Sequence, residues 1–291
     1  MAGTLRGIIP IVYTPFDAAG AIDEAVVRRL VNHLLAAGAH GLAAVGGASE
    51  CHKLSTEERS WLAGIVIDEA RQRVPVIVGV SAATTAVAVI LARQAQVLGA
   101  TAVFATPPTE GDGDLPVLRR HFGALAQATT LPLILQDAQI TVAPGDIATL
   151  AAEVPALQYV KEEAADSGHR ITALRRLAGD RLGILSGGSY LLDDLARGAQ
   201  GAVPGSVGVA DLARAYTQFQ AGHRLAARAS FNHFLPLSFW RRQFPLLGAK
   251  EVLRRQGVFK VATLREPSGQ TLDEHDHQEL TALLLAMGPP Y

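Results

Sequence analysis

Short apolar runs alternate with amphipathic stretches along the first two thirds of the chain. Eight of these runs are almost continuously apolar, which is typical of strands that are buried on both faces of a parallel sheet. The eight runs cover residues 8–12, 41–45, 76–80, 102–105, 133–135, 157–160, 182–185 and 201–203. Between and after them, helical spacing of apolar residues covers 23–37, 56–71, 85–98, 115–128, 144–152, 167–177 and 191–197. The pattern therefore predicts a strand and a helix that alternate along the chain.

Residues at the ends of the predicted helices agree with these boundaries. Ser55 is followed three residues later by Glu58, which is the spacing of a capping box. Gly38, Gly99 and Gly198 each stand where a left-handed helix cap is expected. Eight such units predict an α/β fold, a closed (β/α)8 TIM barrel. An open doubly wound sheet is the alternative, but no phosphate-binding fingerprint follows the first strand.

The strand pattern stops at about residue 210. Helical spacing then covers residues 211–221, 225–234, 246–256 and 273–287. Pro236, Pro245 and Pro267 are expected to mark the breaks between these helices. We therefore expect residues 1–224 to form the barrel that carries the active site. Residues 225–291 are expected to form a C-terminal helical region that packs on the barrel.

Composition and charge exclude several classes of function. The net charge is −1 and the pI is about 6.8, and no basic stripe is present that would bind nucleic acid or an anionic membrane. The apolar runs are too short to cross a bilayer, and the first residues do not have the pattern of a signal peptide. A single cysteine, Cys51, excludes an internal disulfide and suits a reducing compartment. We expect a cytoplasmic protein without nucleic-acid or membrane partners.

Lys161 is the first candidate for chemistry. The chain has four lysines among its 26 lysine and arginine residues, so arginine supplies most of the positive surface charge. Lys161 directly follows the apolar run 157–160, and the carboxyl ends of the strands build the active site of a (β/α)8 barrel. A desolvated amine can lose its proton and attack a ketone, which gives a Schiff base. The alternative is a solvated strand end closed by Lys161-Glu162-Glu163.

The same rule selects further positions around the mouth of the barrel. They are Gly47, Ala48 and Ser49 after the second strand, Gln136 and Asp137 after the fifth, and Ser186 and Gly187 after the seventh. Because side chains alternate along a strand, Lys161 and Glu163 are expected on one side and Glu162 on the other. Glu50 is expected to be a buried carboxylate bonded to loop amides in preference to a catalytic group.

Motifs spread over the whole chain carry a family resemblance. They are Gly7-Ile8-Ile9-Pro10, Thr14-Pro15-Phe16, Gly46-Gly47-Ala48-Ser49-Glu50, Leu131-Pro132-Leu133-Ile134-Leu135, Tyr159-Val160-Lys161-Glu162 and Ser186-Gly187. Together they resemble the dihydrodipicolinate synthase / N-acetylneuraminate lyase family of class I lyases and aldolases. The resemblance implies a TIM barrel in which Lys161 forms the Schiff base. It also implies a homo-oligomer, either a tetramer or a dimer.

Departures from the family pattern bear on the substrate. Gln136-Asp137 stands where the family has its catalytic tyrosine and an asparagine, and no second tyrosine follows Thr106-Pro107. No arginine lies near Thr141, where the resemblance implies one that binds the dicarboxylate end of the substrate in dihydrodipicolinate synthase. An amide such as that of Gln136 forms hydrogen bonds but does not transfer protons at neutral pH. These differences disfavour dihydrodipicolinate synthase activity.

A narrower subgroup matches these departures. Ile134-Leu135-Gln136-Asp137-Ala138 and Gly248-Ala249-Lys250 resemble the L-2-keto-3-deoxyarabonate dehydratases. The resemblance implies that Lys161 attacks the C2 ketone of a 2-keto-3-deoxy sugar acid and that the protonated imine acidifies C3. Glu163 is the candidate for the proton transfer, assisted by Ser49 or by water, and a plain salt bridge of Glu163 is an equal alternative. The expected substrate-binding positions are Gly47, Ala48, Gln136, Asp137, Ser186 and Gly187.

Two other functions stay open at this point. Retro-aldol cleavage that releases pyruvate starts from the same imine. A catalytically degenerate barrel that only binds a keto acid is the second, because the catalytic tyrosine is missing. No cofactor is expected, because the imine itself is the electron sink. His275 and His277 could bind a metal, but they fit the polar start of the last helix better, so no metal site is predicted.

Overall fold

The computed structural model describes residues 5–109, 113–138 and 140–288. Its strands are β1 (Gly7–Ile8), β2 (Leu42–Ala44), β3 (Val76–Gly79), β4 (Ala102–Ala105), β5 (Leu133–Asp137), β6 (Leu157–Glu162), β7 (Gly183–Ser186) and β8 (Gly201–Ala202). The helices of the barrel are α1 (Glu24–Ala36), α2 (Thr56–Ala70), α3 (Thr85–Leu98), α4 (Leu115–Ala128), α5 (Pro144–Glu153), α6 (Ser167–Ala178), α7 (Leu191–Ala196) and α8 (Val209–Gln220). They are followed by α9 (Arg224–Arg241), α10 (Leu247–Arg255) and α11 (Glu274–Met287). Each predicted strand and each predicted helix overlaps one of these elements.

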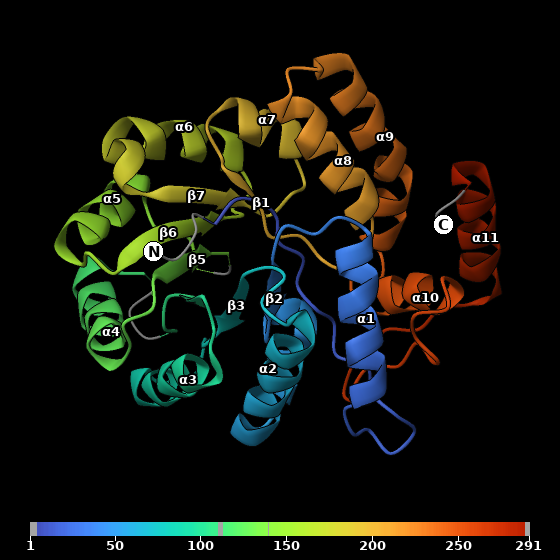
Figure 1. The fold of residues 1–291 in the computed structure, drawn as a ribbon, viewed down its shortest axis with the longest axis horizontal. Helices are drawn as coiled ribbons and strands as arrows, with labels where there is room; N and C mark the ends of the chain where they lie inside the picture. Colours follow the sequence, from blue (N-terminus) through green and yellow to red (C-terminus); the bar gives the residue numbers. More distant parts are fainter. Residues whose placement is uncertain (1–4, 110–112, 139, 289–291) are drawn as a thin grey trace.

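The eight strands form one closed parallel sheet. Its order is β1-β8-β7-β6-β5-β4-β3-β2, and α1 to α8 lie around its outside (Figure 1). A parallel bridge between Ile11 and Ala43 connects the continuation of β1 to β2. The Val12 amide donates to the Ala43 carbonyl at 2.8 Å across the same joint. The predicted (β/α)8 TIM barrel with C-terminal helices is therefore confirmed.

Local sequence signals account for several helix boundaries. The Ser55 hydroxyl accepts from the Glu58 amide at 3.2 Å, and the Glu58 carboxylate accepts from the Ser55 amide at 2.9 Å, so the predicted capping box at the start of α2 is confirmed. Gly99 closes α3 with a φ of 91°, in the left-handed region that favours glycine.

The predicted helix break at Pro236 is wrong. Helix α9 runs through Pro236 without interruption and ends at Arg241. Proline removes one backbone hydrogen-bond donor inside a helix. A helix can contain a proline where the packing of its other side chains compensates for the lost bond. Leu237 and Trp240, which follow Pro236, are both buried, so tertiary packing of the second half of α9 outweighs the local signal.

Two separate sets of buried side chains fill the barrel. The inner set lies inside the ring of strands and consists of Leu5, Ile9, Ile11, Ala43, Ile77, Ala102, Phe104, Ile134, Tyr159, Leu185 and Val203. The outer set, which includes Val160, packs between strands and helices. Tyr159 and Val160 are neighbours in β6 and belong to different sets, as the alternation of a strand requires. This alternation decides which polar residues at the strand ends face the mouth.

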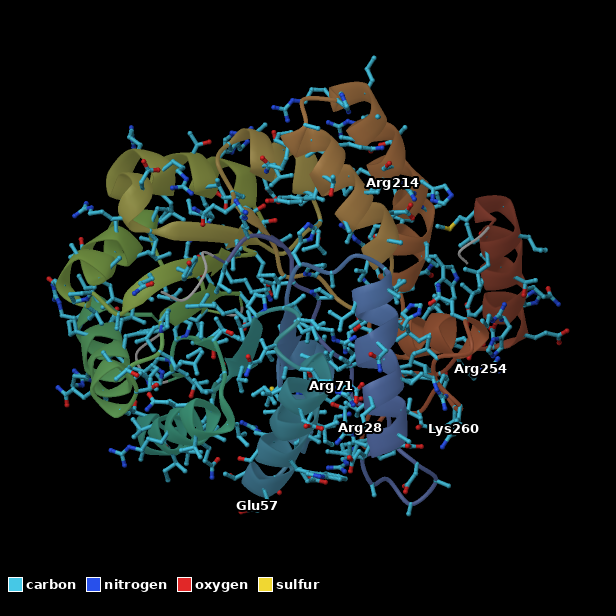
Figure 2. The ribbon with its side chains drawn as sticks, in the orientation of Figure 1. Arg28, Glu57, Arg71, Arg214, Arg254 and Lys260 are labelled. Carbon is cyan, nitrogen blue, oxygen red and sulfur yellow. The ribbon has the colours of Figure 1, made fainter. Side chains whose placement is uncertain are left out.

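Charged side chains gather on the outer helices. Figure 2 labels Arg28 on α1, and Glu57 and Arg71 at the two ends of α2. Arg28 of α1 donates to the carboxylate of Glu69 on α2 at 3.0 Å, so some of these charges tie neighbouring helices together. In the described ranges no helix combines the length and the hydropathy needed to span a membrane.

The C-terminal helices are continuous with the barrel. Helix α9 packs along α8, and the His233 imidazole of α9 bonds the Met287 carbonyl of α11 at 2.9 Å. In α10, the amine of Lys250 reaches the carboxylate of Glu50 beyond β2 at 2.6 Å. The division into residues 1–224 and 225–291 stays a prediction, although α9 begins close to that boundary.

We expect Phe104→Ala to destabilise the fold strongly. Phe104 is 2% exposed in the inner set, and its removal leaves a cavity among rigid strands, so the free energy of unfolding should fall by about 3–5 kcal/mol. Denaturation by urea measures the loss. The control is Val97→Ala on α3, because Val97 is 87% exposed and should cost less than about 0.5 kcal/mol. Equal losses in the two variants would contradict the assignment of an inner core.

Candidate active site

Three of the predicted site residues meet at the carboxyl ends of β5 and β6. Gln136 and Lys161 are direct partners in the register of these strands. The Lys161 amine is in ion-pair contact with one carboxylate oxygen of Glu163, and the Gln136 amide donates to the other oxygen at 3.3 Å. Lys161 is only 2% exposed, whereas the Glu163 side chain keeps 27% of its surface accessible. The amine is thus enclosed, and its carboxylate partner is open to the mouth.

A glycine makes room for this carboxylate. A Cβ atom at Gly187, just after β7, would lie 2.9 Å from the Cβ atom of Glu163. Real Cβ atoms do not approach that closely, so a side chain at position 187 would displace Glu163. The absence of a side chain at Gly187 therefore leaves the space that Glu163 occupies. The Gly187 amide donates to the Glu162 carbonyl at 3.1 Å.

The predicted alternation at the end of β6 is confirmed. Glu162 points outward, where its carboxylate accepts from the Arg170 guanidinium of α6 at 3.1 Å. Arg170 also contacts the carboxylate of Asp137, which accepts from the Val142 amide at 3.0 Å. Burial, reinforced by the negative charge of Asp137 and opposed by Arg170, raises the pKa of Glu162 to about 7.

Asp137 and Ser186 are therefore placed behind the mouth. The Asp137 carboxylate is fully buried among partners on the outer side of the sheet. Ser186 aligns with Glu162 in the register of β6 and β7, and its hydroxyl accepts from the Gly188 amide at 3.2 Å. The nearby Asp194 on α7 is also buried, which raises the pKa of its carboxyl to about 6 against the effect of hydrogen bonds from Ser186 and Ser167. The binding of substrate by Asp137 and Ser186 stays a prediction, and their placement does not favour it.

The loop after β2 is held against the segment that continues β1. Residues Gly47–Ser49 form a short 3-10 helix. The Ser49 hydroxyl donates to the Val12 carbonyl at 2.6 Å and accepts from the Gly46 amide at 3.2 Å, while the Thr14 hydroxyl donates to the Ser49 carbonyl at 2.6 Å. The hydroxyl of Ser49 is occupied by these bonds, so its predicted assistance in catalysis requires a rearrangement. The amides of Gly47 and Ala48 belong to the first turn of the 3-10 helix, where backbone donors have no partner within the helix.

Glu50 anchors the same loop to the C-terminal helices. It adopts a left-handed conformation with a φ of 54°. Its buried carboxylate accepts from the amines of Lys250 at 2.6 Å and Lys53 at 3.2 Å, and from the Arg265 amide at 3.1 Å. The expected bond to a loop amide is therefore accompanied by two lysines that the sequence pattern did not link to it. Burial lowers the pKa of Lys250 to about 8, although the carboxylate of Glu50 opposes this shift.

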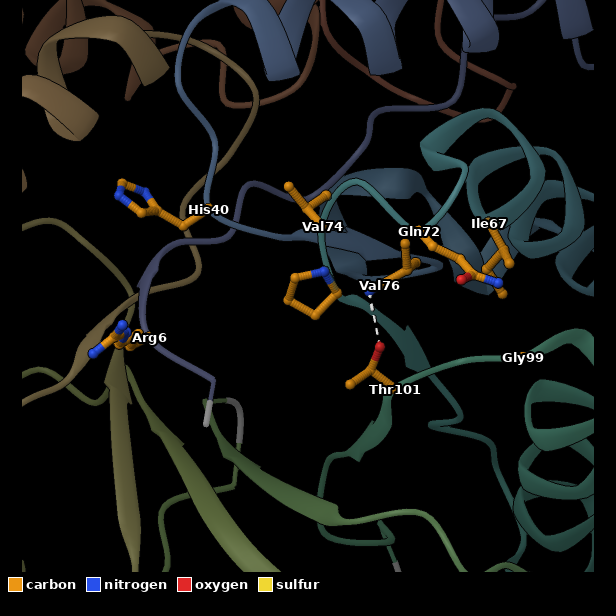
Figure 3. A pocket seen from close by; sticks show the side chains of 9 residues that line it. Arg6, His40, Ile67, Gln72, Val74, Val76, Gly99 and Thr101 are labelled. Carbon is orange, nitrogen blue, oxygen red and sulfur yellow. Dashed lines mark hydrogen bonds between the residues drawn. The ribbon is translucent and has the colours of Figure 1, made fainter. Parts of the chain in front are cut away.

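The cavity in Figure 3 lies at the other end of the barrel. It encloses about 450 Å³, and its lining includes Arg6, His40 and Thr101 near the amino ends of β1, β2 and β4. The Thr101 hydroxyl accepts there from the Val76 amide at 3.2 Å. The amine of Lys161 is at the opposite, carboxyl end of the strands, so this cavity is separate from the candidate site. Within the described ranges, no group of three potential metal-ligating side chains occurs.

The geometry defines a class of enzyme. A buried lysine amine at the catalytic end of a closed barrel is what a class I lyase requires, because its lysine forms a Schiff base with a ketone. The model of the "Dihydrodipicolinate synthetase family" matches residues 4–287. The chain therefore belongs to the dihydrodipicolinate synthetase family and is a Schiff-base lyase that acts on a keto acid.

Individual relatives have different reactions. The chain is 31% identical to L-2-keto-3-deoxyarabonate dehydratase from Azospirillum brasilense, and the match covers 98% of this chain and 95% of the relative. It is 34% identical to 4-hydroxy-tetrahydrodipicolinate synthase from Thermomicrobium roseum over 80% of this chain and 79% of that protein. Among solved structures, YagE from E. coli in complex with pyruvate has a TM-score of 0.91 and 25% identity, and the match covers 98% of this chain and 99% of that one.

We expect the two partners of the Glu50–Lys250 pair to differ in their importance. Glu50→Gln leaves the buried amine of Lys250 without its counter-charge and should lower the free energy of unfolding by about 3 kcal/mol. Lys250→Met should cost less, because Glu50 keeps Lys53 and the Arg265 amide as partners. Urea denaturation of both variants and of the double variant checks this order. A larger loss in Lys250→Met than in Glu50→Gln would contradict it.

Proposed function

We propose that the chain is a dehydratase of a 2-keto-3-deoxy sugar acid, with Lys161 as the Schiff-base nucleophile and Glu163 as the proton-transfer group. The contact of the Lys161 amine with the Glu163 carboxylate carries this proposal. Because Gln136 replaces the tyrosine that the family pattern has at this position, the proton relay needs another group. Glu163 is the ionisable side chain that touches the amine, and Gln136 orients it through a hydrogen bond of 3.3 Å.

The first half of the reaction forms the imine. Glu163 accepts a proton from the amine of Lys161, and the neutral amine attacks C2 of the keto acid. The protonated Glu163 then returns its proton to the C2 hydroxyl of the carbinolamine, which leaves as water. The result is a protonated imine beside an ionised carboxylate. The substrate carboxylate would be held by the amides of Gly47 and Ala48, which have no partner within the 3-10 helix.

The second half eliminates water from the substrate. The protonated imine withdraws electrons from C3, so Glu163 can remove a C3 proton and leave an enamine. The electron pair of the enamine then expels the C4 hydroxyl, which takes the proton from Glu163 and leaves as water. Hydrolysis of the unsaturated imine regenerates Lys161. Over the whole cycle the substrate loses one water, and Glu163 carries the protons between the amine, C3 and the two leaving hydroxyls.

Two observations favour this reaction over its rivals. The dehydratase from Azospirillum brasilense matches this chain over almost its whole length. Gln136 also disfavours 4-hydroxy-tetrahydrodipicolinate synthesis, which in the family pattern uses the tyrosine at this position. Retro-aldol cleavage to pyruvate is the second candidate, because it starts from the same imine. The retained contact between Lys161 and Glu163 disfavours a barrel that only binds its keto acid.

We further propose an oligomeric state and a cellular location for the protein. A homo-oligomer, a tetramer or a dimer, follows from the family resemblance. A cytoplasmic location follows from the single cysteine and from the near-neutral charge. The proposed reaction uses only the imine and protein side chains, so no cofactor or metal takes part in it.

Borohydride trapping tests the nucleophile. Wild-type protein incubated with pyruvate or with 2-keto-3-deoxy acids should gain the mass of one reduced adduct, which peptide mapping should place on Lys161. Lys161→Ala should lose the adduct and keep its denaturation midpoint. An adduct on another lysine, or the absence of an adduct with every keto acid, would contradict the proposal. Analysis of the released product distinguishes loss of water from release of pyruvate.

Exchange of the carboxylate tests the proton transfer. Glu163→Gln keeps the size of the side chain but removes its ability to accept a proton, so turnover should fall by about 10²–10⁴-fold. Trapping with pyruvate should still label Lys161, because the lysine is intact. Asp166→Asn is the matched control, since the Asp166 side chain is 64% exposed and lies three residues further along the chain. Turnover of Glu163→Gln that stays within about threefold of the control would assign Glu163 to a plain salt bridge.

A further inference from the structure

Arg241 lies at the catalytic end of the barrel. Helix α8 follows β8 and runs toward the amino ends of the strands, as every barrel helix does. Only residues 221–223 separate it from α9, which packs along it and returns in the opposite direction. Arg241 is the last residue of α9, so its backbone stands at the level of the mouth.

Tyr13, which belongs to the buried set between strands and helices, holds the guanidinium of Arg241 beside the loop after β8. The Arg241 Nη1 atom donates to the Tyr13 hydroxyl at 3.0 Å. Tyr13 follows the end of the first strand segment and is 1% exposed. A Cβ atom at Gly205, in the loop after β8, would lie 2.2 Å from the same hydroxyl. The phenol therefore rests directly on that loop and fixes where the guanidinium stands.

The guanidinium has no carboxylate partner in the described part of the chain. Its other bond goes to the Pro245 carbonyl at 3.4 Å, and its Nε atom is buried without a hydrogen-bond partner. Arg170 differs sharply, because it contacts two buried carboxylates. Buried polar groups in folded proteins are almost always bonded, so an exception of this kind calls for an explanation. A guanidinium presents its donors in a planar fork that suits acceptor oxygens.

We propose that Arg241 binds the end of the substrate that lies farthest from the keto acid. This inference rests on the proposed function, because it takes the imine on Lys161 as the other end of the bound substrate. The distance from β6 to β8 is two strand spacings, or about 10 Å. A five- or six-carbon keto acid together with the arginine side chain is long enough to cover this distance. The chemistry that Arg241 recognises is a hydroxyl or a carboxylate oxygen on the substrate tail. Tyr13 acts as a positioning residue, because it holds the guanidinium without reaching the substrate itself.

The experiment compares keto acids with and without a tail. For each protein, the concentration that half-saturates borohydride trapping on Lys161 is measured with pyruvate, with a 2-keto-3-deoxypentonate and with 2-ketoglutarate. The variants are Arg241→Ala and Tyr13→Phe, and Arg242→Ala is the matched control because Arg242 is the next residue and is exposed. Pyruvate has no tail, so its trapping reports on imine formation alone.

A selective loss supports the proposal. Arg241→Ala should raise the half-saturating concentration about tenfold or more for at least one tailed keto acid and less than about twofold for pyruvate. An effect on the deoxypentonate alone assigns a hydroxyl tail, and an effect on 2-ketoglutarate alone assigns a carboxylate. Tyr13→Phe should shift the same acid by a smaller factor, and Arg242→Ala should shift none.

Three results would overturn the role of Arg241. These are an equal shift for pyruvate and the tailed acids, no shift for any acid, or the same shift in Arg242→Ala. Each of them leaves the Schiff-base lyase in place, because wild-type trapping on Lys161 is measured in the same series. Absence of trapping in the wild type would instead remove the proposed function and this inference together.

Discussion

Three consecutive ionisable residues, 161–163, stand at the end of β6, and the alternation of side chains along the strand places them on two different faces of the sheet. Lys161 and Glu163 face the mouth, where they form the ion pair that we propose to react. Glu162 faces the helices and joins Arg170 and Asp137 in a buried cluster. A shift of the strand by one residue would exchange the faces of these residues and bury Lys161 behind the sheet. The paired register with β5 and β7 therefore maintains the chemistry as well as the fold.

The outer cluster also supports the inner pair. Arg170 ties α6 to the ends of β5 and β6 through the carboxylates of Asp137 and Glu162. These two strand ends carry Gln136 and Lys161 on their other faces. The geometry of the site is thus supported from behind by charges that the substrate does not reach. The loop after β2 has comparable support, because Ser49 is bonded to Val12 beyond β1 and Glu50 to Lys250 of α10.

Much of the fold and part of the site could be predicted from sequence because their signals are local. Continuous apolar runs indicate parallel strands, and strand alternation places Lys161 and Glu163 together. The break expected at Pro236 failed because the burial of Leu237 and Trp240 depends on distant packing. The bond between Glu50 and Lys250 joins residues 200 positions apart. No local sequence pattern indicates such a pairing. Nor does one indicate that the hydroxyl of Ser49 is already hydrogen-bonded to the backbone.

The closure of the barrel has a consequence for the order in which the protein is made. β1 pairs with β8 through Gly7 with Gly201 and Ile8 with Ala202, so one edge of β1 stays open until the last strand has left the ribosome. Contacts of such long sequence separation slow folding, because the intervening chain must be confined before they form. The anchor of the strand-two loop comes later still, since Lys250 belongs to α10. During synthesis Lys161 therefore emerges well before the chain segment that anchors the loop after β2 on the opposite side of the mouth.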